Sequence, residues 1–340
     1  MIIESFDTDK KVLIIAEIGN NHEGSYTLAE EMIGRAAEAG ADAVKFQAIV
    51  PEKLVSVKER DRIRQLEKFR LSRVEFEKLS QVAKKNDVLF LVTPFDIESV
   101  HFLDPLVPAF KIASGDNNFF PLIEVLAETG KPLIFSSGLA NLKEMKRTKD
   151  FVEQKWRLRG IKQSLAILHC IVSYPTAPED ANLLAIRALQ KLKVTVGYSD
   201  HTQGIDAAVL SVALGARVIE KHFTISKNHS SFRDHQLSAD PPEMASLVRR
   251  VREASQLLGE GVKQLRDCEK ENQTKVRRSI VARHPLKKGK VISLEDIDWV
   301  RPGTGLEPGR EKEIIGKRLK RSLEKGETIL IPDTASRKRD

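Results

Sequence analysis

The stretch VTVGYSDHTQGIDAAVLSVALGARVIEKHFT, residues 194–224, contains one complete repeat of the fold that we expect. Two apolar runs rich in Val and Ile, 194–200 and 216–224, are separated by a segment of helical character. A histidine, His201 or His222, stands near the end of each run, where the apolar pattern stops. The stretch therefore predicts a strand, a helix and a second, parallel strand whose ends carry polar side chains.

The same unit recurs along the chain before this stretch. Six further apolar runs are each followed by a helix-like segment, and they are residues 12–19, 43–49, 88–95, 109–115, 132–138 and 165–172. Ser72 and Glu75 form a capping box at the start of one such helix. Eight strand–helix units in about 260 residues predict an α/β fold, the (β/α)₈ TIM barrel. The alternative is an open, doubly wound sheet, which the absence of a Gly-rich dinucleotide fingerprint disfavours.

The composition predicts two domains and no membrane span. The chain has 340 residues, 41% of them hydrophobic, which is enough for one large core and a smaller module. No run approaches the roughly 20 apolar residues that cross a bilayer, and the opening MIIESFDTDKK lacks the pattern of a secretory signal. Cys170 and Cys268 match neither a disulfide framework nor a zinc CxxC pattern, so we interpret them as reduced structural thiols. We expect a soluble, cytoplasmic protein without membrane partners.

The pattern of the chain changes after the eighth unit. We predict a barrel domain over 1–260, a polar linker over 261–276, a small β-rich domain over 277–337 and a tail at 338–340. Residues 277–340 carry 17 Lys+Arg and 10 Asp+Glu, most of the chain's net charge of +8. Such a module would bind an anionic small molecule or nucleic acid, or present a solvated face. The basic residues are mixed with acids and lack stacking aromatic residues, which favours the solvated face and argues against nucleic acid.

Polar side chains gather at the predicted carboxyl ends of the strands, which in a TIM barrel face one rim. These residues are Glu17, Lys45, Gln47, Thr93, Lys111, Ser114, Asp116, Ser136, Ser137, Tyr174, Ser199, His201, Glu220 and His222. Two lysines with several hydroxyls predict a cradle for an anion that has phosphate and carboxylate groups. A salt bridge to a glutamate of the rim is the alternative role for either lysine, and Schiff-base chemistry is a third.

His201 and His222 end neighbouring strands, so we expect their rings to lie about one inter-strand spacing, roughly 5 Å, apart. Two neutral imidazoles with oxygen ligands nearby suit a divalent first-row metal that keeps positions open for substrate. A hydrogen-bonded core histidine is the alternative, but the acidic residues Asp116, Asp200 and Glu220 of the same rim favour the metal. We interpret the remaining histidines without an evident partner set as surface residues; they are His101, His229 and His284.

At these positions the sequence resembles the N-acetylneuraminate (sialic acid) synthases. The matching segments run in order over essentially the whole chain: IAEIGNNHEGS (15–25), KFQ (45–47), TPF (93–95), KIASGD (111–116), SSG (136–138), HC (169–170), YPT (174–176), GYSDHT (197–202), EKHFT (220–224), DH (234–235), RRSIVA (277–282) and RPGTG (301–305). The C-terminal module resembles the antifreeze-like (SAF) domain that is attached to these enzymes. Each motif alone is weak evidence, and the resemblance rests on the occurrence of all of them in the same order.

The resemblance implies a synthase reaction. Phosphoenolpyruvate would condense with the open-chain aldehyde of an N-acetylated aldose of the N-acetylmannosamine type, releasing phosphate and forming a nine-carbon 2-keto-3-deoxy sugar acid. Within the same chemistry, the alternative is a legionaminate or pseudaminate synthase acting on a diacetamido sugar. An alternative of another class is a non-catalytic sugar-binding relative.

The resemblance also implies roles for individual residues. His201 and His222 would hold a divalent ion, Mn²⁺ first, with Mg²⁺ or Co²⁺ as alternatives. Phosphoenolpyruvate would be bound by Lys45, Thr93, Lys111, Ser114, Ser136 and Ser199. The sugar would be bound by Gln47, Tyr174, Asp234 and Arg301. Glu17 and Asp116 would be catalytic, with Asp116 orienting the attacking water, and Arg301 would reach the other subunit's active site in a head-to-tail homodimer.

Three features depart from the family pattern. Val172 stands where the family usually offers a polar side chain. Phe232 and Arg233 precede Asp234, where the family often has Gly-Pro, and Asp116 is shorter than the glutamate found in part of the family. These departures bear on the identity of the sugar and leave the reaction type unchanged.

Overall fold

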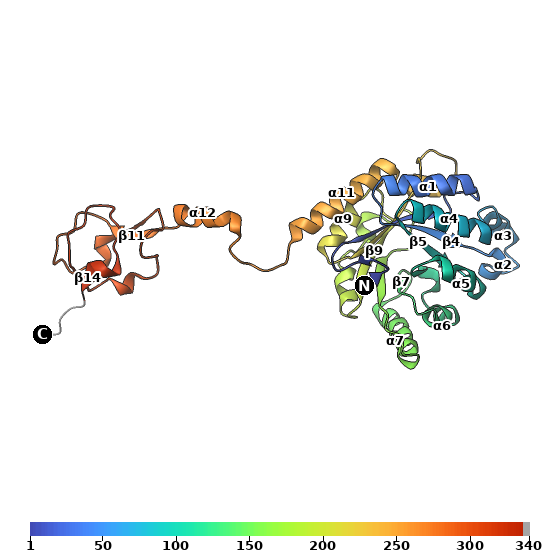
Figure 1. The fold of residues 1–340 in the computed structure, drawn as a ribbon, viewed down its shortest axis with the longest axis horizontal. Coiled ribbons are helices and arrows are strands. Elements are labelled where there is room, and N and C mark those ends of the chain that lie inside the picture. The colour runs from blue at the N-terminus through green and yellow to red at the C-terminus, as the bar shows by residue number, and fades with distance from the viewer. Residues whose placement is uncertain (336–340) are drawn as a thin grey trace. The chain divides into compact units, whose positions relative to one another are not determined.

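The computed structural model of the protein describes residues 1–335. The chain divides into two compact units, one over Met1–Gly259 and one that begins at Glu260, and Figure 1 colours them along the chain. Each unit has a hydrophobic core of its own. The two units are therefore described separately.

The first unit is a closed barrel of eight parallel strands, which confirms the predicted TIM barrel. The strands are β3 (Leu13–Gly19), β4 (Ala43–Ala48), β5 (Leu89–Pro94), β6 (Phe110–Ile112), β7 (Leu133–Ser136), β8 (Leu165–Cys170), β9 (Thr195–Asp200) and β10 (Val218–His222). Each strand pairs with the next in sequence, and β10 closes the barrel on β3 with His222 opposite Glu17. All the strand ends therefore meet at one rim.

Helices between the strands cover the outside of the barrel (Figure 1). They are α1 (Tyr26–Glu38), α4 (Arg73–Lys85), α5 (Ile97–Leu103), α6 (Phe120–Glu128), α7 (Leu142–Leu158), α8 (Ala185–Gln190), α9 (Asp206–Ala213) and α11 (Pro241–Leu258). The predicted capping box begins α4: the Glu75 carboxylate accepts from the Ser72 amide at 2.6 Å. The same helix buries Phe76, Leu79 and Ala83, which share one face at helical spacing. Short helices α2 (Pro51–Leu54), α3 (Arg60–Glu67) and α10 (Arg233–Leu237) lie in the connections after β4 and β10.

A small hairpin precedes the barrel and closes its amino-terminal end. Strands β1 (Ile2–Ile3) and β2 (Phe6–Asp7) pair antiparallel. Met1 and Ile3 pack in one buried cluster with the inward-facing side chains of the barrel, among them Leu13, Leu91 and Ile134. The carboxyl ends of the strands are thus left as the open face of the barrel.

The second unit is small and rich in β-structure. It contains α12 (Asp267–Val276), the antiparallel pair β11 (Ser279–Ala282) with β12 (Ile297–Val300), and the pair β13 (Arg318–Leu319) with β14 (Thr334–Ala335). Helix α12 lies in the segment predicted as a linker and buries no residue. The predicted tail, 338–340, and the last residues of the predicted domain lie outside the described residues. Within residues 1–335, no helix combines the length and apolar character that a bilayer crossing requires.

Candidate active site

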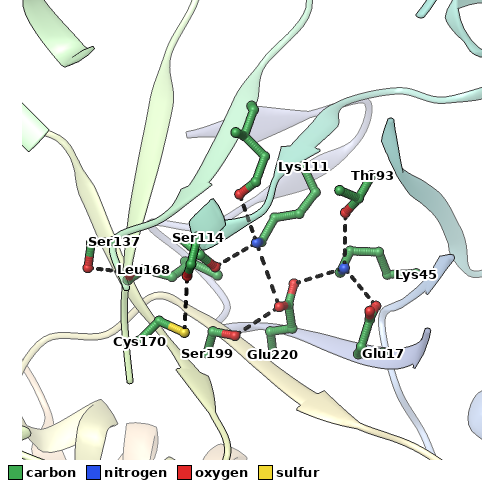
Figure 2. Close-up of polar contacts among 12 residues, drawn as sticks. Glu17, Lys45, Thr93, Lys111, Ser114, Ser137, Leu168, Cys170, Ser199 and Glu220 are labelled. Carbon is green, nitrogen blue, oxygen red and sulfur yellow. Dashed lines mark hydrogen bonds and ion pairs between the residues drawn. The ribbon is translucent and has the colours of Figure 1, made fainter. Parts of the chain in front are cut away.

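The carboxyl ends of the strands bring the two predicted lysines around one carboxylate (Figure 2). Lys45 of β4 and Lys111 of β6 are both buried. The Lys45 ammonium lies 3.8 Å from Oε2 of Glu220, and the Lys111 ammonium lies 3.7 Å from its Oε1. Two buried cations thus share one buried anion that comes from β10.

Hydroxyl groups fix this cluster from three further strands. Lys45 donates to Thr93 Oγ1 at 3.1 Å, and Lys111 donates to Ser136 Oγ at 2.6 Å. Ser199 donates to Glu220 Oε1 at 2.9 Å. All three hydroxyl residues are buried, so the lysines and their shared carboxylate are held in place before any ligand binds.

Glu17 of β3 provides a second carboxylate for Lys45. Its Oε2 lies 2.7 Å from the Lys45 ammonium, and its Oε1 accepts from Gln47 Nε2 at 2.8 Å. The rim salt bridge that is the alternative role for Lys45 is therefore present in the structure. Each lysine of the cluster has a carboxylate partner at this stage.

The two carboxylates of the cluster differ in their affinity for a proton. Burial raises the pKa of Glu17, since Lys45 offsets the loss of solvation only in part. Burial acts in the same direction on Glu220, but Lys111 and Lys45 lower its pKa to about 2. Burial lowers the pKa of Lys111, whereas for Lys45 burial is outweighed by Glu17 and Glu220, which raise it. Of the two carboxylates, Glu17 is therefore the one suited to take up a proton when an anion enters.

The turn after β6 brings Ser114 and Asp116 to the same rim. Both belong to a short 3₁₀ turn, Ser114–Asp116, and Ser114 Oγ lies 3.5 Å from Sγ of Cys170 at the end of β8. The next residue, Asn117, donates to the Ser136 carbonyl at 3.3 Å and so holds the turn against β7. Burial raises the pKa of Asp116 to about 6. Asp116 can therefore change its protonation state near neutral pH.

His201 and His222 lie side by side, as predicted, with ring centroids 5.5 Å apart. His201 Nδ1 lies 2.7 Å from the Ile171 carbonyl, an acceptor, so this nitrogen carries a proton and Nε2 is left to bind a metal. Burial and His201 lower the pKa of His222 to about 3, so its imidazole is neutral. For His201, burial is outweighed by Cys170 and the Ile171 carbonyl, which raise its pKa. The donor set fits a divalent ion with two imidazole ligands and open positions.

Tyr174 and Asp234 line the side of the mouth where the histidines lie. The Tyr174 ring centroid is 4.2 Å from that of His201. Burial raises the pKa of Tyr174, and the Asp234 charge adds to this rise. Arg233 donates to the Tyr174 carbonyl at 2.6 Å, and the Phe232 ring lies 4.8 Å from that of Phe69. The two residues that depart from the family pattern before Asp234 therefore tie this loop to its neighbours.

One predicted residue, Asp200, faces away from the cluster. Asp200, expected among the acidic partners of the metal, pairs instead with Lys221 at 2.9 Å and accepts from the Thr202 hydroxyl at 2.8 Å. That expectation is wrong because successive strand residues point to opposite faces, and Ser199 and His201 take the inner one. Arg301 belongs to the second unit, where it is exposed just after β12. Its role at another subunit's site stays a prediction.

Two residues have a larger part in the site than the sequence analysis gave them. Glu220, considered only as an acid near the metal, lies between the two lysines. Cys170, interpreted as a structural thiol, lies between Ser114 and His201, with its Sγ 3.8 Å from Nδ1 of the histidine. Glu220 could have been found from the sequence because it lies two residues before His222 on one strand, so that both side chains face the same way. The signal for Cys170 is its place at the end of β8, in register with Ser199.

A separate group of metal-ligating side chains lies in the loops after β3 and β10. Glu23, His229 and His235 each offer one ligand atom, and these atoms all lie within 4.8 Å of one another. Among residues 1–335, no other group of three or more metal-ligating side chains lies this close together. His229 is exposed, as expected of a surface residue, but the expectation that it lacks partners is wrong.

Known proteins resemble the chain over both of its units. A family model of the NeuB family matches residues 32–263, and one of the SAF domain matches residues 277–333. The N,N'-diacetyllegionaminic acid synthase of Legionella pneumophila is 39% identical over 332 residues, which are 93% of this chain and 93% of that one. The human N-acetylneuraminate-9-phosphate synthase is 35% identical over 337 residues, 93% of this chain and 91% of the human one. The crystal structure of the N-acetylneuraminic acid synthetase from Leptospira borgpetersenii, in complex with citrate, has a TM-score of 0.75 at 34% identity and covers 80% of this chain and 94% of that chain.

Proposed function

Because the chain belongs to the NeuB family and carries an SAF domain, we propose that it condenses phosphoenolpyruvate with the open-chain aldehyde of an N-acetylated aldose. Its relatives are synthases of sialic, legionaminic and pseudaminic acids, so the chain is an enzyme of this class. The proposed product is a nine-carbon 2-keto-3-deoxy sugar acid, formed with release of inorganic phosphate. N-acetylmannosamine is the first candidate for the sugar.

The buried lysine pair is the observation that carries this proposal. Phosphoenolpyruvate has a phosphate and a carboxylate, and the cluster offers it two ammonium groups with the hydroxyls of Thr93, Ser136 and Ser199 around them. Ser114 lies at the same rim. Glu17 is the partner of Lys45 in the structure; a bound anion would take its place, while Glu17, whose pKa is raised, would take up a proton. Desolvated charges in such a preformed site bind an anion far more strongly than they would in water.

The remaining residues fit the steps of the reaction. The lysines and hydroxyls hold phosphoenolpyruvate with C3 facing the aldehyde carbon, while Gln47, Tyr174 and Asp234 hold the sugar. As the new C–C bond forms, the aldehyde oxygen takes the proton that Glu17 has acquired and becomes a hydroxyl, while C2 becomes electrophilic. Asp116 takes a proton from the water that adds to C2. The C–O bond to phosphate then breaks as the new C2 hydroxyl gives its proton to the departing phosphate, which leaves a ketone at C2. A divalent ion held by His201 and His222, Mn²⁺ first, would supply Lewis acidity to the aldehyde oxygen.

A diacetamido sugar is the second candidate substrate, as legionaminate and pseudaminate synthases would use. The loop before Asp234 bears on this choice, because Phe232 packs on Phe69 and Arg233 donates to the Tyr174 carbonyl where the family often has Gly-Pro. Val172, in place of a polar side chain, is 39% exposed and offers no hydrogen bond to a substrate. Both features reshape the part of the site that would contact the sugar's substituents.

Phosphate release from phosphoenolpyruvate tests the proposal. We expect release only when an N-acetylated or diacetamido sugar and a divalent ion are both present. His201→Ala should lower the rate by about 100-fold or more, since it removes one of two metal ligands. His101→Ala, an exposed histidine outside the site, is the matched control and should keep the wild-type rate. Release that persists in a chelator, or in His201→Ala, would contradict the metal assignment, and no release with any of the sugars would contradict the synthase activity.

A further inference from the structure

We propose that Glu23, His229 and His235 form a second site for a divalent cation of the zinc type, distinct from the His201–His222 pair. Two imidazoles and one carboxylate, with a fourth position left to water, are a common donor set for Zn²⁺. The three ligand atoms lie within 4.8 Å of one another. The ion would join the loop after β3, which holds Glu23, to the loop after β10, which holds both histidines.

These two loops are already fastened together on their buried side. Asn21 donates to the Phe223 carbonyl and to Ser238 Oγ, both at 2.8 Å. The turn that follows Asn21 is tight: Glu23 has φ 48, and at Gly24, with φ +79, a Cβ would lie 2.2 Å from the Lys68 carbonyl oxygen. The backbone therefore fixes the direction in which the Glu23 carboxylate leaves the loop.

His235 faces this carboxylate with a nitrogen suited to a metal. Its side chain is fully buried, and its Nδ1 lies 2.6 Å from Thr224 Oγ1, which in turn lies 3.1 Å from the Ser226 carbonyl. A hydroxyl that donates to this carbonyl accepts from Nδ1–H, and in this tautomer the lone pair of His235 is on Nε2. An outer hydrogen bond that fixes the tautomer in this way is typical of metal-binding histidines.

The spacing of one pair of donors is close to that of two ligands on one metal. His235 Nε2 lies 3.0 Å from Glu23 Oε1. Nitrogen and oxygen ligands of one tetrahedral zinc, with bonds of roughly 2.0–2.1 Å, lie about 3.3 Å apart.

His229 is the residue that favours a metal site over a simpler hydrogen-bond chain. Thr224, His235 and Glu23 could form a plain hydrogen-bond chain in which His235 accepts from the hydroxyl and donates to the carboxylate. That chain has no use for His229, whose ring centroid nevertheless lies 5.1 Å from that of His235. A cation needs the third ligand, and the hydrogen-bond chain does not.

The position of the site gives the ion a consequence for the sugar pocket. His235 follows Asp234 directly in α10, so an ion on His235 would fix the backbone that carries Asp234. This step rests on the proposed function, whereas binding of the ion does not. If Asp234 binds the sugar, loss of the second ion should raise KM for the sugar several-fold while changing kcat less.

Zinc binding to the full chain tests the proposal without relying on activity. We would use the His201→Ala/His222→Ala double variant, stripped of metal, and titrate it with Zn²⁺ calorimetrically and with Co²⁺ by visible absorption. We expect one ion per chain with a tetrahedral cobalt spectrum, and a rise in melting temperature on adding Zn²⁺. Adding His229→Ala should weaken binding by about 10-fold or more and remove the spectrum, whereas His101→Ala should change neither.

A second measurement keeps the test decisive should the double variant fail to fold. In the otherwise wild-type chain, His229→Ala should lower the number of tightly bound Zn²⁺ ions by one per chain. His229 is exposed, so this substitution does not disturb a core. If the count and the affinity are unchanged by His229→Ala, or if the parent binds no ion, the hydrogen-bond chain is the correct description and the metal site is not.

Discussion

Glu220 explains why two lysines can be buried a few ångströms apart at the mouth of the barrel. Its carboxylate lies within 4 Å of both ammonium groups and accepts a hydrogen bond from Ser199. Because its pKa is lowered to about 2, it stays charged at neutral and mildly acidic pH. An unpaired buried charge costs several kcal/mol, so without Glu220 the lysines would repel each other and lose their protons. We infer that Glu220 is a positioning residue for the anion cradle.

At the same scale, the raised pKa of Asp116 predicts a pH dependence. A carboxyl group with a pKa of about 6 is protonated, and useless as a base, below that pH, and it is ionised above it. We therefore expect kcat/KM, which reports ionisations of the free enzyme, to fall as the pH drops through about 6 and to level off above it. Asp116→Asn should lower kcat by about 100-fold or more and abolish this limb, whereas Asp116→Glu should retain it. Values of kcat/KM from about pH 5 to 8 would measure this, and an unchanged limb in Asp116→Asn would remove Asp116 from the mechanism.

The sequence predicted which residues reach the rim better than it predicted how they pair there. Reading the strand ends identified both lysines and their hydroxyl partners, because strand alternation fixes the face of each residue. Alternation also explains the error at Asp200, which lies between two inward residues and so faces Lys221. The sequence did not predict contacts across the barrel. Glu220 of β10 lies between the lysines of β4 and β6 only because the barrel closes. The meeting of Glu23 with His229 likewise depends on β3 pairing with β10.

Among the elements, the amino-terminal hairpin has a clear structural task that the sequence did not reveal. Its strands have two residues each, too short for an alternation pattern to be detected. The structure shows Ile3 fully buried in the inner cluster of the barrel, while its neighbour Ile2 is 59% exposed. The hairpin thus fills the end of the barrel opposite the site, and its contribution is to stability.

This arrangement predicts different effects for two neighbouring isoleucines. Ile3→Ala should destabilise the barrel by about 2–5 kcal/mol, because it leaves a cavity at a closely packed end of the core. Ile2→Ala, the matched control, should change stability by less than about 0.5 kcal/mol. Urea unfolding of the full chain, followed by far-UV circular dichroism, would measure both. Equal effects of the two substitutions would show that the hairpin does not fill the end of the barrel. The kcat of folded Ile3→Ala should stay near that of the wild type.

For the whole molecule, the main question is what the second unit contributes. Its core is a small apolar cluster that includes Ile280, Ile297 and Ile329. A domain of this size is of marginal stability alone, which favours its docking on another surface. In the sequence, the change from apolar strand-like runs to a polar, charged segment was the basis for predicting a second domain. Helix α12 was missed because none of its residues is buried, so no apolar face marks it.

The proposed head-to-tail dimer makes a prediction about which chain completes each site. Arg301, exposed after β12, would enter the active site of the other subunit. We would co-express Arg301→Ala and His201→Ala chains with different tags and purify the heterodimer through both tags. If Arg301 acts in trans, the barrel of the Arg301→Ala chain receives an intact arginine, and the heterodimer keeps about half the wild-type activity. If Arg301 acts within its own chain, both sites are defective and the heterodimer is inactive.

A second heterodimer reverses these outcomes and so controls for poor assembly. It pairs the wild-type chain with the Arg301→Ala/His201→Ala chain. Action in trans leaves this dimer without a complete site, because the wild-type barrel meets the substituted arginine, whereas action in cis leaves one complete site and about half the activity. Reduced activity from misfolding would lower both heterodimers together and could not produce opposite results. A chain that never co-purifies with its differently tagged partner would rule out the dimer itself, and with it the role we propose for Arg301 at a neighbouring site.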